Sequence, residues 1–468
     1  MQLMNPFSII LVCIIGYILY VSKDEKTCYI NFLILTIVIN ALYMQGYFVY
    51  IGGNERPYDL VMNIFFTLIS INCFRKYISE VHFKTFTWAG LFFLSIFLGL
   101  VYFTIDPFHG YVVDSTVGYS WDNYAAGANV EGLPVLHYGT IFFALMYFLE
   151  GLLSVVIIRD KLTIDDYQYI TGKVIKFLYI LFFYGIFEFI IKNFINNQIL
   201  FTLIGGLLGT GSSTYTISME RGSFEALQGF SREPSHYVFS LFLFLTFIFV
   251  KEQYLSRKPF FKREVLTIII TFLIMLLSGS FAALIYIFSF LCMLIVYKLA
   301  FLSKKKRFVF YVVLFISILG GIAYLATVGL DDDSYLGSRI NASFLVLSLL
   351  STDGLRGIGG LSSALPRFMS IYETGLDFLD RPFLGVGLSV ESCHSGWMTF
   401  LSYTGLLGVY LWFKMLFAEE DHDKLLVLFF LIIPHILVGV WLWIVTIPSI
   451  FIVMMLRRDF LTESTKDS

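Results

Sequence analysis

The sequence predicts an all-α integral membrane protein: a polytopic transmembrane helical bundle of about 12–13 spans that forms a single domain over residues 1–468. Of its residues, 58% are hydrophobic and 14% are charged, and the mean hydropathy is +0.79. Soluble chains typically contain about 45–50% apolar and about 25% charged residues. Composition therefore excludes an ordinary soluble protein, and apolar runs near the ~20 residues of a bilayer crossing recur along the chain.

About thirteen apolar segments are expected to cross the membrane. Several are shorter than the ~20 residues of a full crossing, so their ends must extend into the flanking sequence. The last two could instead be one segment bent at Pro434. The first has neither a preceding Lys or Arg nor a small-residue cleavage site after it, which indicates a retained span and not a signal peptide. The segments are Leu3–Val21, Tyr29–Tyr47, Leu60–Phe74, Thr85–Thr104, Tyr138–Ile158, Val174–Phe194, Tyr237–Val250, Val265–Leu277, Phe281–Ala300, Phe308–Thr327, Trp397–Phe417, Leu425–Gly439 and Leu442–Leu456.

The distribution of Lys and Arg predicts the orientation of the bundle. Of the 32 basic residues, 24 lie in alternate loops and the C-terminal tail, and by the positive-inside rule these segments face the cytoplasm. The N-terminus is then outside and the C-terminus inside. The large loops Ile105–His137, Ile195–His236 and Val328–Gly396 (105–137, 195–236 and 328–396) all face outward. The basic segments are Lys23–Lys26, Arg75–Lys84, Arg159–Lys176, Lys251–Arg263, Lys298–Arg307, Lys414–Lys424 and Arg457–Lys466.

The second and third outer loops carry basic residues of one type. Their basic residues are Arg221, Arg232, Arg339, Arg356, Arg367 and Arg381. Arginine presents a planar fork that suits phosphate and carboxylate, and it is weakly hydrated enough to lie at an interface. This bias predicts an anionic ligand on the outer face. The alternative for any single Arg is a solvated loop residue or a structural ion pair.

The second outer loop ends in a cluster of polar side chains that leads into an apolar span. Arg232 and Glu233 precede Pro234, which suits the first position of a helix. His236 and Tyr237 follow one turn later, so both are expected to lie over Glu233. A cation, a carboxylate, an imidazole and a phenol would then converge at the mouth of a membrane helix. The alternative is a capping cluster that only fixes the helix entry.

The third outer loop is too long for a connector, because loops beyond about 12–15 residues are usually functional or disordered. Pro366 and Arg367 begin a predicted surface helix whose N-terminal amides would add to an anion site. The loop Val328–Trp397 is predicted to fold back over the helix that begins at Pro234. Gly385 and Gly387 let the backbone pass close to a ligand or to another helix. His394 lies at the entrance of the following span, where a neutral imidazole could act as a base or could simply be hydrogen-bonded.

Two predicted spans contain acidic residues, which are costly in a bilayer and are therefore candidates for function. Glu150 has no evident partner in the sequence, whereas Glu188 precedes Lys192 by four residues and is expected to pair with it. No metal site is predicted. The five cysteines show no metal-binding spacing, and the run Asp331–Asp333 is interpreted as a solvated loop start.

The sequence contains, in this order, the motifs Arg232–Pro234, the Leu277–Ser280 turn, Arg381–Gly387 followed by His394, and Tyr403–Gly408. Together these motifs resemble those of the bacterial O-antigen polymerase (Wzy-type) and O-antigen ligase superfamily. The resemblance covers about Glu225 to Phe417, and the first six spans match only in being hydrophobic. It implies a GT-C-like fold and a metal-independent, cofactor-free glycosyltransferase that uses undecaprenyl-diphosphate-linked glycans at the outer leaflet.

The resemblance also implies roles for the predicted site residues. The diphosphate would be held by Arg232, Arg339, Arg367 and Arg381, and Glu233 or His394 would take the proton from the attacking sugar hydroxyl. Which Arg serves donor or acceptor stays open. Further candidates are His236, Tyr237, Arg221 and Glu150.

The expected function is polymerisation of lipid-linked repeat units in the bacterial inner membrane, with surface polysaccharide such as lipopolysaccharide as the product. Its partners would be the lipid-linked donor and acceptor, membrane lipid and a chain-length-determining protein, and no nucleic acid is expected. A ligase that transfers the glycan to a lipid acceptor is the nearest alternative. A glycolipid flippase or secondary transporter is the alternative from another class, but such proteins place charges near the midplane of paired repeats, whereas here the charges gather at the outer rim.

Overall fold

The computed structural model describes residues 5–43, 47–51, 54–77, 83–106, 110–111, 131–132, 138–195, 203–205, 207–208, 220–221, 224–231, 233–256, 260–300, 371, 374–388, 395–418, 422–436 and 446–457. Within these ranges the protein is a bundle of helices, as predicted, with three short antiparallel strand pairs in the connections. The strands are β1 (Tyr47–Ile51) with β2 (Asn54–Pro57), β3 (Gly110–Tyr111) with β4 (Glu131–Gly132), and β5 (Glu220–Arg221) with β6 (Phe224–Glu225).

The helices follow the predicted apolar segments closely. They are α1 (Pro6–Val21), α2 (Glu25–Leu42), α3 (Tyr58–Tyr77), α4 (Phe83–Ile105), α6 (Tyr138–Lys161), α7 (Ile164–Ile190), α10 (Pro234–Phe249), α11 (Lys262–Leu277), α12 (Phe281–Ala300), α17 (Gly396–Leu416), α18 (Lys424–Val427), α19 (Ile433–Ile436) and α20 (Ile447–Met455). Three π-helical turns continue or join them, namely η2 (Ile191–Ile195) after α7, η3 (Val250–Leu255) after α10, and η4 (Leu428–Ile432) between α18 and α19.

Four of the described helices are long and apolar enough to cross a membrane. They span Glu25–Leu42, Lys84–Ile105, Ile164–Ile195 and Pro234–Leu255. Every predicted span except Phe308–Thr327 overlaps a described helix, and that segment lies outside the described residues. Large apolar side chains are exposed along α1, α4, α7 and α11, as expected for helix faces that meet hydrocarbon. By contrast, α10 is almost entirely buried and forms the centre of the core.

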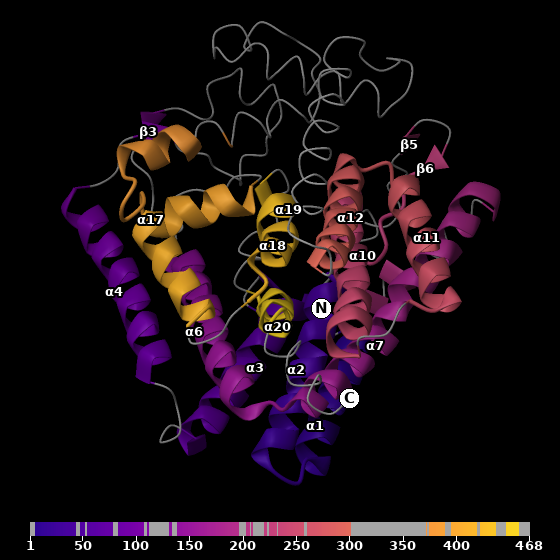
Figure 1. The fold of residues 1–468 in the computed structure, drawn as a ribbon, viewed down its shortest axis with the longest axis horizontal. Coiled ribbons are helices and arrows are strands. Elements are labelled where there is room, and N and C mark those ends of the chain that lie inside the picture. The colour runs from indigo at the N-terminus through magenta and orange to yellow at the C-terminus, as the bar shows by residue number, and fades with distance from the viewer. Residues whose placement is uncertain are drawn as a thin grey trace, which may run out of the picture.

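The predicted span Trp397–Phe417 is not a continuous helix, so that prediction is corrected, whereas the last two predicted spans are described only in part. The segment Trp397–Phe417 is broken at Gly405, whose backbone is not helical, and Figure 1 shows α17 as two arms at an angle. The segments predicted after Leu425 form α18 to α19 and the nine-residue α20. Asp423 N donates to Leu456 O at 2.9 Å, so the start of one lies beside the end of the other. In Figure 1, α18 and α19 lie between α17 and α12, whereas α20 lies lower in the bundle, where it packs against α6 and α2.

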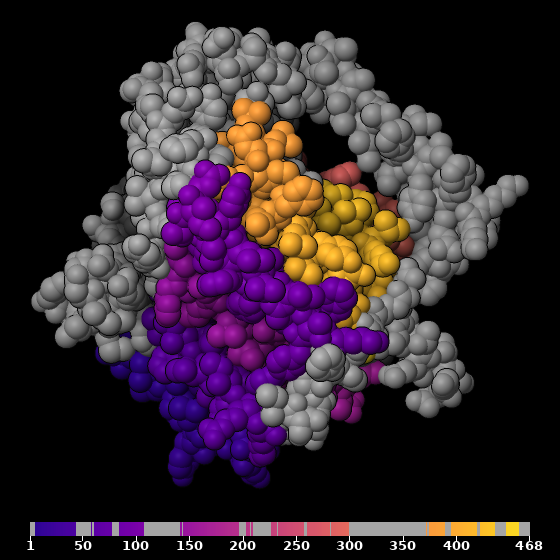
Figure 2. Space-filling model, turned by 90° about the vertical axis from the view of Figure 1, so that its left-hand side faces the viewer, coloured from indigo at the N-terminus to yellow at the C-terminus, as the bar shows by residue number. Residues whose placement is uncertain are grey.

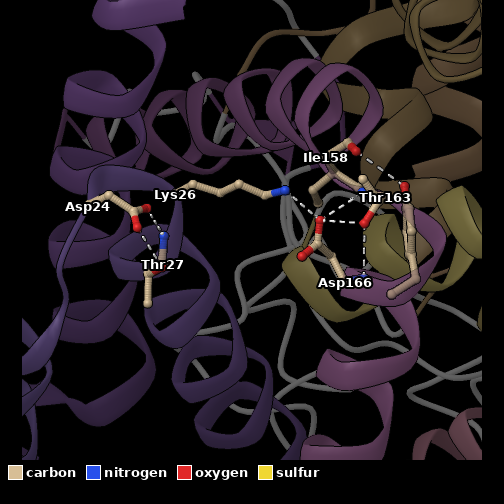
Figure 3. A network of polar contacts seen from close by, with 7 residues as sticks. Asp24, Lys26, Thr27, Ile158, Thr163 and Asp166 are labelled. Atoms are coloured by element: carbon tan, nitrogen blue, oxygen red, sulfur yellow. Dashed lines mark hydrogen bonds and ion pairs between the residues drawn. The ribbon is translucent and has the colours of Figure 1, made fainter.

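The described parts of the basic segments gather at one end of the bundle, which we call the basic end. Lys26 at the start of α2 pairs with Asp166 at the start of α7 at 2.6 Å, and Asp166 also accepts from Thr163 in a capping box (Figure 3). Arg159 at the end of α6 donates to Leu416 O at 3.0 Å. Nearby, the backbone amide of Thr27 lowers the pKa of Asp24 below its ordinary value. The opposite end, called the loop end, carries β3, β5 and β6, which are described parts of the predicted outer loops (Figure 1).

Candidate functional site

The predicted site residues fall into two groups. Glu233, His236, Tyr237, Glu150 and Arg381 lie within the described residues. Four others lie outside the described residues, namely Arg232, Arg339, Arg367 and His394. For Arg221 in β5, only the backbone is described.

A buried ion pair on α7 and η2 holds the loop that leads to Glu233. Lys192 Nζ lies 2.7 Å from Glu188 Oε1, with side chains only 5% and 2% exposed, so the predicted pairing is confirmed. The Glu188 carboxylate also accepts from the backbone amides of Gln228 at 2.9 Å and Gly229 at 2.8 Å. Lys192 donates to the carbonyl of Ala226 at 3.0 Å. These two side chains thus fix a loop as well as each other.

Such a pair is favourable in a buried site only when further hydrogen bonds satisfy its remaining donors and acceptors. Here backbone groups of the 226–229 loop provide them. The loop itself is buried, and Gly229 turns it with a φ of +61°. The consequence is a rigid connection from α7 to the first turn of α10.

Tyr237 helps to hold the 226–229 loop and does not lie at the mouth of α10. Its ring packs against Gly229, its hydroxyl donates to Leu181 O at 2.8 Å, and it is fully buried. The expectation that it lies over Glu233 is therefore wrong. Glu233 is the N-cap residue and has an extended backbone, so the i to i+4 rule for helix faces does not apply to it, and the ring of Tyr237 is directed at α7.

His236 is directed to a different neighbour, at the C-terminus of α2. Its ring centroid lies 4.4 Å from that of Tyr43, and both residues are half-buried. Tyr43 adopts a left-handed conformation with a φ of 46°, and its carbonyl accepts from Ser231 Oγ at 3.3 Å. His236 thus remains at the loop end, between α2 and α10.

Glu233 occupies the N-cap position of α10, with Pro234 following at the first helical position as predicted. Its side chain makes no capping bond to the helix and accepts from Ser235 Oγ at 3.3 Å. The residue is half-buried. A carboxylate that is held on a rigid loop without serving as a cap can accept a proton or bind a hydroxyl group.

Arg381 makes a structural ion pair. Its guanidinium lies 3.0 Å from the Asp106 carboxylate, donates to the Asp106 carbonyl at 2.8 Å, and stacks over the Tyr102 ring at 4.6 Å. This joins the end of the third outer loop to the end of α4, and Figure 2 shows the orange surface of this loop beside the purple surface of α4. Of the two interpretations of the outer-loop arginines, anion binding or a structural ion pair, the geometry of Arg381 agrees with the structural ion pair.

The glycines that follow Arg381 approach another helix. The turn Pro382–Leu384 enters the break in α17, where Leu406 N donates to Pro382 O at 2.8 Å and Val386 N donates to Ser402 O at 2.9 Å. A Cβ on Gly385 would lie 2.9 Å from Gly405 N. The inserted turn thus satisfies backbone groups that the break would otherwise leave without partners.

The loop Val328–Trp397 was expected to fold back over the helix that begins at Pro234. Its described part, Thr374–Leu388, lies against α4 and α17 instead, with Leu384 O near Gly99. Residues 328–370 of this loop lie outside the described residues, so the predicted contact with the start of α10 stays a prediction. Glu150 is buried within α6, which packs on α3 and α20, and so belongs to the core of the bundle.

Sequence reasoning missed one residue of interest, His435 in α19. The N-cap residue of α17, Ser395, donates to its carbonyl at 3.3 Å, and the His435 ring lies 5.3 Å from that of Phe239 in α10. The start of α17, next to the predicted base His394, is thereby linked to α10. The only local signal was a Pro-His pair within an apolar run.

The chain matches no protein-family model, no curated protein and no solved structure.

Proposed function

We propose that this protein is a glycosyltransferase with a GT-C-like fold that polymerises undecaprenyl-diphosphate-linked oligosaccharide repeat units. The observation that carries the proposal is Glu233, a carboxylate on a rigidly held loop at the mouth of α10. The arginine bias of the outer loops and the order of the sequence motifs support it.

The proposal includes an orientation in the bacterial inner membrane. The basic end would face the cytoplasm and the loop end would face outward, with the N-terminus outside and the C-terminus inside. The contacts that gather Lys26, Arg159 and Leu416 at one end agree with this charge rule. The large loop Val328–Gly396, with its surface helices, would then cover the lipid head groups.

In the proposed reaction a sugar hydroxyl of the acceptor attacks the anomeric carbon of the donor. Glu233 or His394 takes the hydroxyl proton, a bond forms from the oxygen to the anomeric carbon, and the bond to the diphosphate oxygen breaks with inversion. The electron pair leaves with the lipid diphosphate. Its charge is neutralised by arginines, for which Arg232, Arg339 and Arg367 are the candidates.

The broken helix α17 raises the alternative of a transporter, because transporters use discontinuous helices to bind substrates and ions. In such sites the freed backbone groups face the ligand. Here the turn Pro382–Leu384 fills the break and bonds to Leu406 and Leu407. This geometry favours a structural use of the break over an ion site.

Deletion of the gene distinguishes the candidate functions through the surface glycan. Loss of a polymerase leaves single repeat units attached at the surface, whereas loss of a ligase strands polymer on the carrier lipid. Loss of a transporter traps units inside the cell. We expect the first pattern, restored by the wild-type gene, and an unchanged glycan ladder would contradict the enzyme proposal.

Substitution of the proposed base tests the site. If Glu233 is the base, Glu233→Gln should slow polymerisation by about 10²–10⁴-fold, because general-base catalysis contributes that much. The matched control is Ser235→Ala, which removes only the neighbouring hydroxyl donor. The readout is ladder length at equal protein level, and His394→Ala and Arg367→Ala are measured alongside. Normal ladders in all three site variants would refute the proposed site.

A further inference from the structure

A buried imidazole that the proposed reaction does not use lies beneath the loop end. His435 is fully buried, and neither of its ring nitrogens has a hydrogen-bond partner among the described residues. Its backbone is held by Ser395, whose hydroxyl donates to its carbonyl at 3.3 Å. Leu431 precedes His435 by one helical turn, and its carbonyl accepts from Trp397 Nε1 at 3.1 Å. The start of α17 therefore fixes the helix segment that presents the imidazole.

A second polar group of the same kind lies beside it. Tyr286 of α12 is fully buried, and its hydroxyl also lacks a hydrogen-bond partner within the described ranges. Its ring centroid lies 6.5 Å from that of His435. Phe239 of α10 packs against both rings, at 5.3 Å from His435 and 5.6 Å from Tyr286. Two polar groups with unmet hydrogen bonds thus share one aromatic environment.

This arrangement is unfavourable for folding alone. A buried donor or acceptor without a partner costs about 1–3 kcal/mol, and the alternative partners in a membrane interior are few. Apolar residues at these two positions would fill the same space without that cost. The pair is therefore better explained by a group that binds there.

The hydrogen-bonding capacity of the pair indicates the class of ligand. A neutral imidazole has one donor and one acceptor, and a phenol hydroxyl also offers both. The complement is a group that donates and accepts, which is a hydroxyl of a sugar or of water. A metal ion would need further Cys, His or carboxylate ligands, and the described residues contain no such cluster.

We propose that His435 and Tyr286 form a subsite that binds a hydroxyl group of the sugar substrate. The inference rests on the proposed function, and it adds binding residues from α12 and α19 to a site predicted on α10 and the third outer loop. Ser395 directly follows the predicted base His394, and Phe239 lies six residues after Glu233. The subsite is closed in this structure, so substrate entry must displace a neighbouring side chain.

Two substitutions test the subsite in the purified full-length protein, reconstituted in vesicles with undecaprenyl-diphosphate-linked repeat units. His435→Phe and Tyr286→Phe should each raise KM by about 3- to 10-fold, the effect of losing one hydrogen bond to a neutral group. The thermal unfolding midpoint should stay the same or rise, because each change removes an unmet polar group. A merely structural role would not move KM.

Matched controls lie at the basic end, where Tyr297 belongs to α12 and His422 lies just before α18. His422→Phe and Tyr297→Phe change the same residue types far from the loop end, and Tyr297 already donates to Gln253 O at 2.6 Å. We expect Tyr297→Phe to lower the unfolding midpoint and neither control to change KM. Unchanged KM in both subsite variants, with active wild-type protein, would mean that the pair binds only water and would overturn the inference. An intact ladder after gene deletion would instead overturn the proposed function.

Discussion

Replacing Glu188 with Ala is expected to destabilise the protein by about 3–5 kcal/mol, the usual cost of removing one partner of a buried ion pair. The substitution leaves the Lys192 ammonium buried beside an apolar side chain. It also removes the acceptor of the Gln228 and Gly229 amides, which hold the loop before α10. Denaturant titration of the purified protein in micelles measures the loss. Glycan polymerisation should fail as well, because Glu233 follows this loop.

The matched control is Glu25→Ala, which also removes a glutamate that pairs with a lysine. The Glu25 and Lys76 side chains are 38% and 52% exposed, so this pair contributes no more than about 1 kcal/mol. Glu188→Gln keeps one oxygen acceptor for a backbone amide and should fall between the two. Equal effects of Glu188→Ala and Glu25→Ala would show that the buried pair does not hold the loop.

The second large effect is expected from Gly405→Ala, at the break in α17. Gly405 has a φ of 62° and a ψ of −178°, a region that is essentially restricted to glycine. An added Cβ would also lie 2.6 Å from Gly385 N and against the Phe383 carbonyl. Backbone atoms on both sides cannot give way as a flexible side chain can. The loss of stability should be about 3 kcal/mol or more.

Gly16→Ala provides the control, because a Cβ at this position in α1 meets nothing within 4 Å. Glycine within a helix costs about 0.5–1 kcal/mol relative to alanine, so this variant should be slightly more stable than the wild type. Both variants are compared by the same titration. If Gly405→Ala behaved like Gly16→Ala, the turn Pro382–Leu384 would not be packed into the break.

Much of the fold could be predicted from the sequence, because it depends on local properties. The length and apolarity of each segment located the helices, as in Phe281–Ala300, whose bounds agree with α12. The i to i+4 spacing of Glu188 and Lys192 predicted their pairing. The alternation of basic loops predicted one common end, and the contacts between Lys26 and Asp166 agree with it.

The site itself was only partly accessible to such reasoning. Polar residues near the start of α10 were expected to converge, but Tyr237 is directed at Leu181, a partner 56 residues earlier in the chain. Arg381 was interpreted as a phosphate ligand, although Asp106 neutralises it from a helix 275 residues away. No local pattern shows which distant carboxylate or carbonyl a side chain will meet.

By itself, then, the sequence determined that this protein is an apolar helical bundle, and it predicted that the basic segments share one end. Hydropathy and charge are properties of short segments, so the helices and the basic segments can be predicted from them without knowledge of the packing. Only the tertiary structure decided that Gly385 and Gly405 serve a helix break, because a glycine in an apolar run is compatible with a continuous helix. The same holds for His435 and Tyr286, whose proximity depends on how α19 packs against α12.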